Sequence, residues 1–312
     1  MVSLKEVSRR GERLAPGHRL CAGCGAGAVV RQILLSTETP IVVSTATGCL
    51  EVSTTIFPYT SWRTPWIHCA FENAASTISG VESMYQVLRR RGLIKDRIKF
   101  LAFGGDGGTY DIGFQALSGA LERGHDIVYV CYDNEAYMNT GIQRSGATPK
   151  GAWTTTSPSG EVIPGKKEHK KNLTEVVAAH NIPYVAQSTP AHFQDLLEKA
   201  RKAIEVDGPA FLNVLSPCPR GWRFPADQTM HIAREAVKCC YWPTYEVEEG
   251  EYRLTGDSAK IAKGKLEKTP VEEYMRKQGR CKHLFTEKNK HIIEQIQKFV
   301  DKEWEKLLAK AS

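Results

Sequence analysis

Two hydrophobic periods alternate along most of the chain. Short apolar runs at residues 41–44, 98–103 and 127–132 are typical of β-strands, and the last run is continuous, as in a strand covered on both faces. Between the first two runs, residues 72–91 carry apolar and small side chains at helical spacing, and Gly92 ends the helix. This order predicts an α/β fold with a mostly parallel sheet and helices on both faces.

The same alternation continues as far as residue 215. The other predicted elements are strands at residues 66–70, 184–187 and 210–215 and helices at residues 112–121, 173–180 and 193–206. Residues 140–171 interrupt the pattern, because they are rich in Gly, Ser, Thr and Pro and have no hydrophobic period. We expect a long ordered loop there, and loops of that length in compact domains are usually functional.

We divide the chain at residue 218. Residues 1–218 hold the predicted α/β domain, and the alternation stops in residues 219–312, where residues 292–308 form an amphipathic helical pattern. A segment with so little core of its own needs another surface to cover its apolar side chains. We therefore interpret residues 219–312 as a C-terminal arm that packs on partner subunits.

Composition narrows the class of protein. Of the 312 residues, 41% are hydrophobic and 25% are charged, a balance that excludes a disordered chain. The sequence contains no run of about 18 apolar residues that could span a membrane. Its first residues lack the apolar segment of a secretory signal. We therefore expect no membrane contact and a cytoplasmic location.

The net charge of +7 raises the question of a nucleic-acid partner. Trp62, Arg63, Trp66 and His68 form an aromatic and basic cluster of the kind that can stack on bases. No basic stripe surrounds this cluster, which lies in a Pro-punctuated stretch. We interpret it as a subunit contact or a wall of an active site, and we expect no nucleic-acid partner.

Two loops follow consecutive predicted strands and carry the clearest chemistry. The first, residues 104–108, reads Gly-Gly-Asp-Gly-Gly, and the second is residues 133–141. A right-handed crossover would bring both loops to the carboxyl edge of the sheet, where open α/β sheets bind ligands. The glycines let backbone N–H groups approach a phosphate, and Asp106 and Asn134 offer hard oxygens to Mg²⁺ or Ca²⁺. The alternative is a tight turn in which Asp106 caps the following helix.

Nine cysteines are more than an intracellular enzyme needs, and an odd number cannot pair completely. Cys21 and Cys24 form a CxxC motif, Cys49 follows a predicted strand, and Cys218 follows another. Four thiolates can hold either Zn²⁺ or a [4Fe–4S] cluster, and their spacing does not separate the two. Iron is favoured if a cofactor binds beside Thr47, Gly48 and Cys49, because a redox centre there could take electrons from it, whereas zinc could not.

The spacing of the two loops is similar to the thiamine diphosphate-binding motif, in which a GDG sequence is followed by an Asn-containing loop. This resemblance implies that Asp106, Asn134 and the backbone carbonyl of Ala136 hold Mg²⁺. It also implies that Thr140 and the backbone at Gly107 contact the diphosphate and that Gly105 belongs to the coenzyme site. Asn139 would lie toward the reacting end of the thiazolium ring, and we assign it a catalytic role.

The chain as a whole resembles the β, or thiamine diphosphate-binding, subunit of the pyruvate:ferredoxin oxidoreductase family. The segments that carry the resemblance are CAGCG at 21–25, ATGCLEVSTT at 46–55, PYTSWRTPWIH at 58–68, FENAAS at 71–76, GGDGGTYDIG at 104–113, YDNEAYMNTGIQRS at 132–145, GAWTTTSP at 151–158 and SPCPRGW at 216–222. The family implies a [4Fe–4S] cluster on Cys21, Cys24, Cys49 and Cys218. It also implies that Thr47, Gly48 and Cys49 lie beside the coenzyme.

The implied activity is oxidative decarboxylation of a 2-oxoacid, with pyruvate as the leading substrate. Electrons would pass through the cluster to ferredoxin, and the acyl group would pass to coenzyme A. The expected partners are subunits of the α, γ and δ type, one of which supplies the glutamate that activates the aminopyrimidine. Relatives that act on oxalate without coenzyme A, on branched 2-oxoacids or on 2-oxoglutarate are alternatives. A zinc-stabilised nucleotide-binding module is the non-redox alternative.

Overall fold

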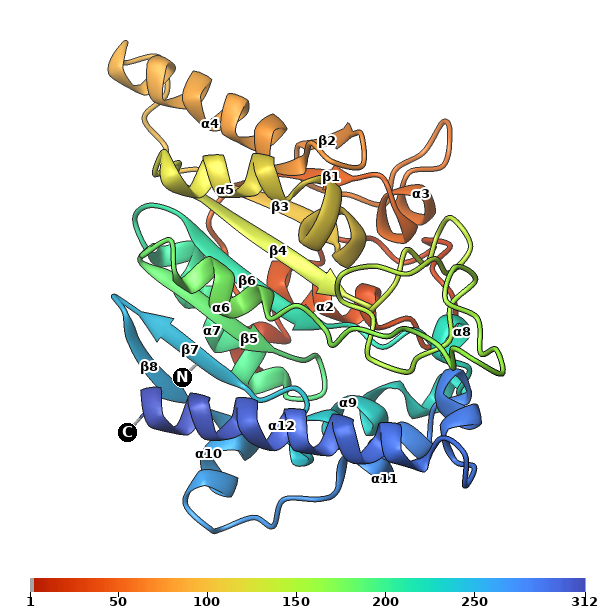
Figure 1. Ribbon diagram of the computed structural model, residues 1–312. Helices are drawn as coiled ribbons and strands as arrows, with labels where there is room; N and C mark the ends of the chain where they lie inside the picture. Colours follow the sequence, from red (N-terminus) through yellow and green to blue (C-terminus); the bar gives the residue numbers. More distant parts are fainter. Residues whose placement is uncertain (1–2, 312) are drawn as a thin grey trace.

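Eight strands form one sheet in the computed structural model, which describes residues 3–311 (Figure 1). Their order across the sheet is β2-β1-β3-β4-β6-β5-β7-β8. The strands are β1 (Ile41–Ala46), β2 (Trp66–Cys69), β3 (Lys99–Gly105), β4 (Ile127–Asp133), β5 (Tyr184–Ser188), β6 (Ala210–Leu215), β7 (Tyr245–Glu248) and β8 (Glu251–Leu254). The first six pair in parallel, which confirms the predicted fold class, whereas β7 is antiparallel to β5 and β8 to β7.

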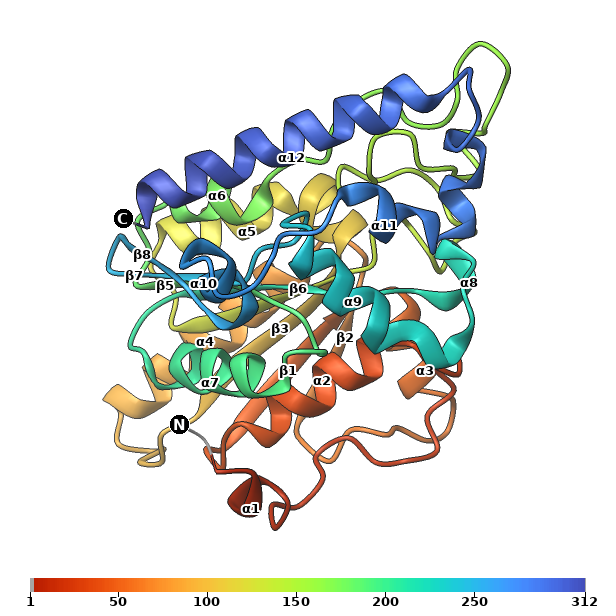
Figure 2. The same ribbon diagram turned by 90° about the horizontal axis from the view of Figure 1, so that it is seen from below.

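Helices cover both faces of the sheet. They are α1 (Leu4–Val7), α2 (Gly25–Leu35), α3 (Cys49–Thr54), α4 (Ala74–Arg90), α5 (Phe114–Glu122), α6 (Leu173–Ala178), α7 (Phe193–Glu205), α8 (Pro219–Trp222), α9 (Thr229–Lys238), α10 (Gly256–Ala262), α11 (Val271–Arg276) and α12 (Lys290–Lys310). A π-helix spans Gly107–Ile112, and short 3₁₀ helices span Ala226–Gln228 and Gly279–Leu284. Figure 2 shows α5, α6 and α12 on one side of the strands and α2 and α7 on the other.

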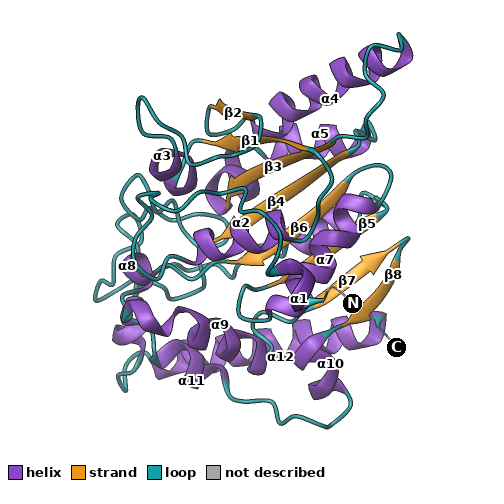
Figure 3. Cartoon of the chain, turned by 180° about the vertical axis from the view of Figure 1, so that it is seen from behind, coloured by secondary structure: helices purple, strands orange, loops and turns teal. Residues whose placement is uncertain are grey.

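The two faces arise from the alternation of side chains along each buried strand. In β3, Leu101 and Phe103 join the core under α2 and α7, whereas Phe100 and Ala102 join the core under α4, α5 and α12. A strand buried on both faces therefore needs the continuous apolar run that the sequence shows. The view from behind shows α2 and α7 lying across the strands (Figure 3).

The C-terminal segment packs on its own chain. Strands β7 and β8 extend the sheet beyond β5, and Tyr245 and Val247 of β7 belong to the same core as the central strands. Helix α12 covers that core with a face that includes Ile296 and Trp304. The sequence did not predict the two short antiparallel strands. Contact of residues 219–312 with partner subunits stays a prediction.

The connections after β1 and β3 leave in opposite directions. From β1 the chain runs through α3 to β2, and from β3 it runs through the π-helix and α5 to β4 on the other side. Adjacent parallel strands whose connections diverge in this way open a crevice at their carboxyl ends. As predicted, residues 140–171 form neither helix nor strand, and they lie beyond the arrowhead of β4 (Figure 1).

The helices between residues 3 and 311 do not combine the length and the hydropathy that crossing a bilayer requires.

Candidate active site

A small cavity lies at the crevice between β1 and β3. All ten residues predicted to bind the coenzyme line it: Thr47, Gly48, Cys49, Gly105, Asp106, Gly107, Asn134, Ala136, Asn139 and Thr140. They come from the ends of β1, β3 and β4, whose pairing places Gly105 opposite Tyr132. Four further lining residues, Phe71, Tyr132, Tyr137 and Met138, were not predicted. The parallel sheet thus brings three separate motifs to one place.

Three oxygen atoms converge at one wall of this cavity. The side-chain oxygen Oδ1 of Asn134 lies 2.9 Å from Oδ1 of Asp106 and 2.8 Å from the carbonyl oxygen of Ala136. Three acceptors repel one another at this distance unless a cation lies between them. Neighbouring ligands of an octahedral Mg²⁺, with Mg–O bonds of 2.0–2.1 Å, lie about 2.9 Å apart. The arrangement therefore fits Mg²⁺.

The same three atoms have a metal-free alternative. Turning the Asn134 amide by 180° would point its NH₂ group at Asp106 and Ala136 and replace the repulsion with two hydrogen bonds. The orientation of this one amide therefore distinguishes a cation site from a neutral hydrogen-bonded loop.

Asp106 is fully buried at the start of the π-helix. Its Oδ2 accepts a hydrogen bond of 2.5 Å from Ser145, and its Oδ1 accepts one of 3.3 Å from the backbone N–H of Asn134. Burial and the neighbouring carboxylate of Asp133 raise the pKa of Asp106 well above its usual range. A dication held by the three oxygens would instead lower the pKa of Asp106, because it favours the ionised carboxylate.

Gly107 leaves room that any other residue would fill. A Cβ atom at this position would lie 2.6 Å from ring carbons of Tyr137. Tyr137 is held in place because its hydroxyl donates a 3.1 Å hydrogen bond to Asp111, and both Gly107 and Tyr137 line the cavity. The absence of a side chain is thus what lets the loop close over this wall.

Gly107→Ala is expected to weaken coenzyme binding about 5- to 150-fold, because a clash in a packed site costs roughly 1–3 kcal/mol. Titration of thiamine diphosphate at fixed Mg²⁺ measures this change. The matched control is Gly80→Ala, because Gly80 lies in α4 with no atom within 4 Å of an added Cβ. That variant should bind the coenzyme normally. Equal affinity of the two variants would show that Gly107 does not shape the site.

The last two predicted residues lie at the edge of the cavity. Asn139 and Thr140 are both exposed, unlike the buried Asn134 and Ala136. Thr140 Oγ1 donates a 2.5 Å hydrogen bond to Oε1 of Gln143, which holds this turn. The two side chains can therefore reach a molecule that enters from solvent, while the buried residues can reach only its inner end.

The four cysteines of the predicted cluster come from three parts of the chain: Cys21 and Cys24 share the turn before α2, Cys49 begins α3, and Cys218 directly precedes α8. All four are free thiols, and Cys49 also lines the small cavity. Burial and the nearby thiols of Cys218, Cys24 and Cys21 raise the pKa of Cys49 to about 12. Each of these sulfurs is therefore close enough to influence the charge of Cys49. Binding of a metal centre would require loss of their protons.

Two further observations concern these cysteines. Cys218 precedes α8, and its Sγ accepts a 3.3 Å hydrogen bond from the N–H of Gly221, as thiolate ligands often do. Within residues 3–311, no three His, Cys, Asp or Glu side chains lie close enough together to hold a single metal ion. The donor set of four thiols fits a [4Fe–4S] cluster, in which each thiolate binds a different iron.

A buried network of charges behind the metal loop was not predicted. Lys170 Nζ lies 2.7 Å from Oδ2 of Asp133 and 3.0 Å from Oε1 of Glu135, and Arg280 pairs with Oε2 of Glu135. Burial alone would raise the pKa of Glu135, but Lys170 and Arg280 outweigh it and lower that pKa. Arg280 is 145 residues from Glu135 along the chain, so no local motif could reveal the pair.

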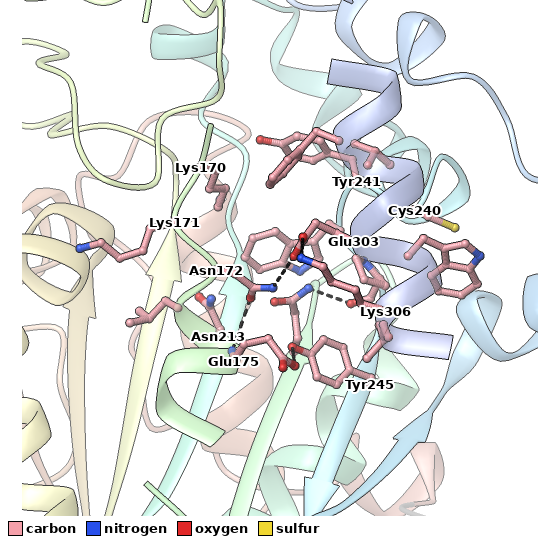
Figure 4. Close-up of a pocket in the computed structure, with 18 of the residues that line it drawn as sticks. Lys170, Lys171, Asn172, Glu175, Asn213, Cys240, Tyr241, Tyr245, Glu303 and Lys306 are labelled. Atoms are coloured by element: carbon pink, nitrogen blue, oxygen red, sulfur yellow. Dashed lines mark hydrogen bonds and ion pairs between the residues drawn. The ribbon is translucent and has the colours of Figure 1, made fainter. Parts of the chain in front are cut away.

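A second cavity, of about 570 Å³, lies on the other side of Lys170, between α6, α12 and the segment before β7. Figure 4 shows Glu303 and Lys306 of α12 beside Asn172, which donates a 3.5 Å hydrogen bond to Glu303. Lys170 Nζ lies 4.4 Å from the centre of the Trp242 ring. None of the predicted coenzyme or metal ligands lines this cavity.

The chain is similar to known proteins over most of its length. Residues 46–214 match the family model for the thiamine pyrophosphate enzyme, C-terminal TPP binding domain. The chain is 52% identical over 294 residues to pyruvate synthase subunit PorB of Methanocaldococcus jannaschii, covering 94% of this chain and 95% of that protein. It is 43% identical over 296 residues to ketoisovalerate oxidoreductase subunit VorB of Pyrococcus abyssi, covering 95% and 92%.

A solved structure shares the fold. The 2-oxoglutarate:ferredoxin oxidoreductase from Magnetococcus marinus, with 2-oxoglutarate, coenzyme A and succinyl-CoA bound, matches with a TM-score of 0.55 and 21% identity. The match covers 72% of this chain and 79% of that one.

Proposed function

Because the chain belongs to the 2-oxoacid:ferredoxin oxidoreductase family, as a β subunit of the pyruvate synthase type, we propose that it holds thiamine diphosphate through Mg²⁺ in the small cavity and oxidises pyruvate. The observation that carries this proposal is the set of three converging oxygens, from Asp106, Asn134 and Ala136. They lie in a cavity lined by every residue that the motif assigns to the coenzyme.

Asp106, Asn134 and the Ala136 carbonyl would hold the metal ion, which would supply positive charge to anchor the diphosphate. The backbone at Gly105 and Gly107 and the hydroxyl of Thr140 would contact the diphosphate oxygens. When bound, thiamine diphosphate supplies the carbon that adds to a 2-oxo group and the electron sink for loss of CO₂. The wall formed by the buried Tyr132 and the half-buried Phe71 would help to keep water from the coenzyme.

Thr47, Gly48 and Cys49 would join the two redox groups. All three line the small cavity, while the Cys49 sulfur would bind the [4Fe–4S] cluster together with Cys21, Cys24 and Cys218. A cluster of this kind accepts one electron at a time. Oxidation of one pyruvate therefore needs two transfers onward to ferredoxin, through other subunits of the complex. A zinc ion on the same thiolates could not carry these electrons.

Asn139 would act on the substrate. Its side chain is exposed at the edge of the cavity, next to Thr140. We assign it a hydrogen bond to a substrate oxygen during the reaction. Partner subunits of the α, γ and δ type would supply the glutamate for the aminopyrimidine and the groups that clamp the substrate carboxylate.

Pyruvate is the substrate we propose, with coenzyme A as the acyl acceptor. The support is the 52% identity to a subunit that is named for pyruvate synthase, compared with 43% to one that is named for ketoisovalerate. The overall change would be pyruvate, coenzyme A and two oxidised ferredoxins to acetyl-CoA, CO₂, a proton and two reduced ferredoxins.

The test is dye reduction by the reconstituted complex with pyruvate, 2-oxoisovalerate, 2-oxoglutarate and oxalate, each with and without coenzyme A. Pyruvate should give the highest kcat/KM and should require coenzyme A. A higher kcat/KM for 2-oxoisovalerate or 2-oxoglutarate would show that the protein acts on that substrate class instead of pyruvate. Turnover of oxalate without coenzyme A would contradict the proposal that an acyl group is transferred to coenzyme A. Zinc without iron or sulfide in the purified chain would instead indicate the non-redox module.

A further inference from the structure

Glu135 has an unusual backbone and lies between two of the proposed metal ligands. Its φ angle is +67°, in the left-handed region that residues with a side chain seldom adopt. This turn points the Asn134 side chain and the Ala136 carbonyl toward the same point, where they meet Asp106. A non-glycine residue keeps such a conformation only where its surroundings hold it.

The surroundings of Glu135 hold it from several elements. Its carboxylate is fully buried and accepts hydrogen bonds from Lys170 at 3.0 Å and Tyr241 at 3.2 Å, in addition to the ion pair with Arg280. Its backbone N–H donates to Asp133 at 3.0 Å, and its carbonyl accepts from Thr148 at 2.7 Å. Every polar group of Glu135 is therefore occupied, so the residue cannot rotate without breaking several bonds.

Arg280 connects this loop to the segment that carries Cys218. Its guanidinium lies 4.0 Å from the centre of the Trp222 ring, and Trp222 Nε1 donates a 2.7 Å hydrogen bond to the Asn134 carbonyl. Trp222 is the last residue of α8, which begins directly after Cys218. Arg280 also donates to Gln278, at 2.9 Å and 2.8 Å, and only 2% of its surface is exposed.

We propose that Arg280 is a positioning residue for the coenzyme's metal site, acting through Glu135. In this arrangement the C-terminal segment holds the strained turn that aims Asn134 and Ala136 at Mg²⁺, and the same guanidinium packs on the helix after Cys218. The inference rests on the proposed function, since it presumes that a cation binds at these oxygens. It gives residues 219–312 a role in the site of their own chain.

The test uses the full complex with Arg280→Gln and measures the Mg²⁺ concentration that gives half-maximal thiamine diphosphate binding, by calorimetry. Loss of a group that orients a metal ligand typically weakens metal binding about 10- to 100-fold. We therefore expect that concentration to rise at least about 10-fold, while the visible absorption of the iron–sulfur clusters is retained. Arg280→Lys keeps the charge but not the planar stacking, so it should give a smaller rise of about 2- to 5-fold.

Lys199→Gln is the matched control. Lys199 is as buried as Arg280 and pairs with Asp195 at 2.7 Å, but its other partners are Gln187 and Thr255, away from the metal loop. This variant should lower the melting temperature without changing the Mg²⁺ dependence. If the Arg280→Gln subunit does not assemble into the complex, the same Mg²⁺ titration of the Arg280→Lys and Glu135→Gln variants tests the inference.

Mg²⁺ dependence equal to that of the wild type in the assembled Arg280 and Glu135 variants would overturn the inference. An equal rise in Lys199→Gln would also overturn it, because the effect would then be general destabilisation. A wild-type complex that binds no thiamine diphosphate, or binds it without Mg²⁺, would instead overturn the proposed function, and this result is seen before any variant is made.

Discussion

Asp106→Ala is expected to abolish Mg²⁺-dependent binding of thiamine diphosphate by the complex. Asp106 is the one carboxylate among the three converging oxygens, so its removal takes away the charge that holds the dication. Groups that only orient a metal ligand typically contribute about 10- to 100-fold to metal affinity, and loss of a direct ligand should exceed that. We expect coenzyme affinity to fall more than about 100-fold, measured by calorimetric titration with and without Mg²⁺.

Asp111→Asn is the control for this variant. Asp111 lies in the same π-helix and accepts hydrogen bonds from Tyr137 at 3.1 Å and from the Gly146 N–H at 2.9 Å, but it is not one of the three oxygens. Its loss should loosen the wall of the cavity and reduce coenzyme affinity by less than about 10-fold. Full affinity in Asp106→Ala would remove Asp106 from the metal site.

Cys218→Ala is expected to remove or alter one iron–sulfur cluster of the complex. The thiolate of Cys218 would bind one corner of the cluster, and the Gly221 N–H that donates to its sulfur cannot replace it. Iron and sulfide per copy of this chain should fall, the visible absorption should decrease, and ferredoxin reduction should drop to background. Binding of thiamine diphosphate should remain measurable, because Cys218 does not line the coenzyme cavity.

Cys239→Ala is the matched control, since Cys239 is fully buried in the core of the same C-terminal half of the chain. Its iron content and spectrum should equal those of the wild type. An unchanged spectrum and iron content in Cys218→Ala would exclude this cysteine as a ligand and would leave three thiolates at the site.

The α/β core could be predicted from sequence because its signals are local. Each buried strand is a short apolar run, and each long helix shows its own period, so residues 98–103 and 127–132 correspond to β3 and β4 within a few positions. The short antiparallel strands β7 and β8 could not be found in this way. Each has four residues, and β8 is largely exposed, so neither carries a strong period.

The inner surface of the site was predictable for a different reason. The motif residues lie directly after strands, and a parallel sheet brings the ends of its strands together. Thr47, Asp106 and Asn134 therefore meet although they are far apart in the chain. The support behind them was not predictable, because Lys170 and Arg280 reach Glu135 from an irregular loop and from the C-terminal segment.

The aromatic residues in the cavity walls could not be predicted from the sequence either. Tyr132 looked like one more apolar residue of a strand, and Phe71 like the residue before a helix. Only the folded structure shows that both residues line the small cavity, where Tyr132 lies opposite Gly105 in the pairing of β3 with β4.

The orientation of the Asn134 side chain in a structure of the complex with thiamine diphosphate and Mg²⁺ is the most direct measurement. We predict that Asn134 Oδ1 stays turned toward Asp106 and the Ala136 carbonyl, with a cation bound by all three oxygens and by the diphosphate. An amide turned the other way, with its NH₂ group donating to Asp106 and no cation between them, would contradict the proposed anchoring of the coenzyme.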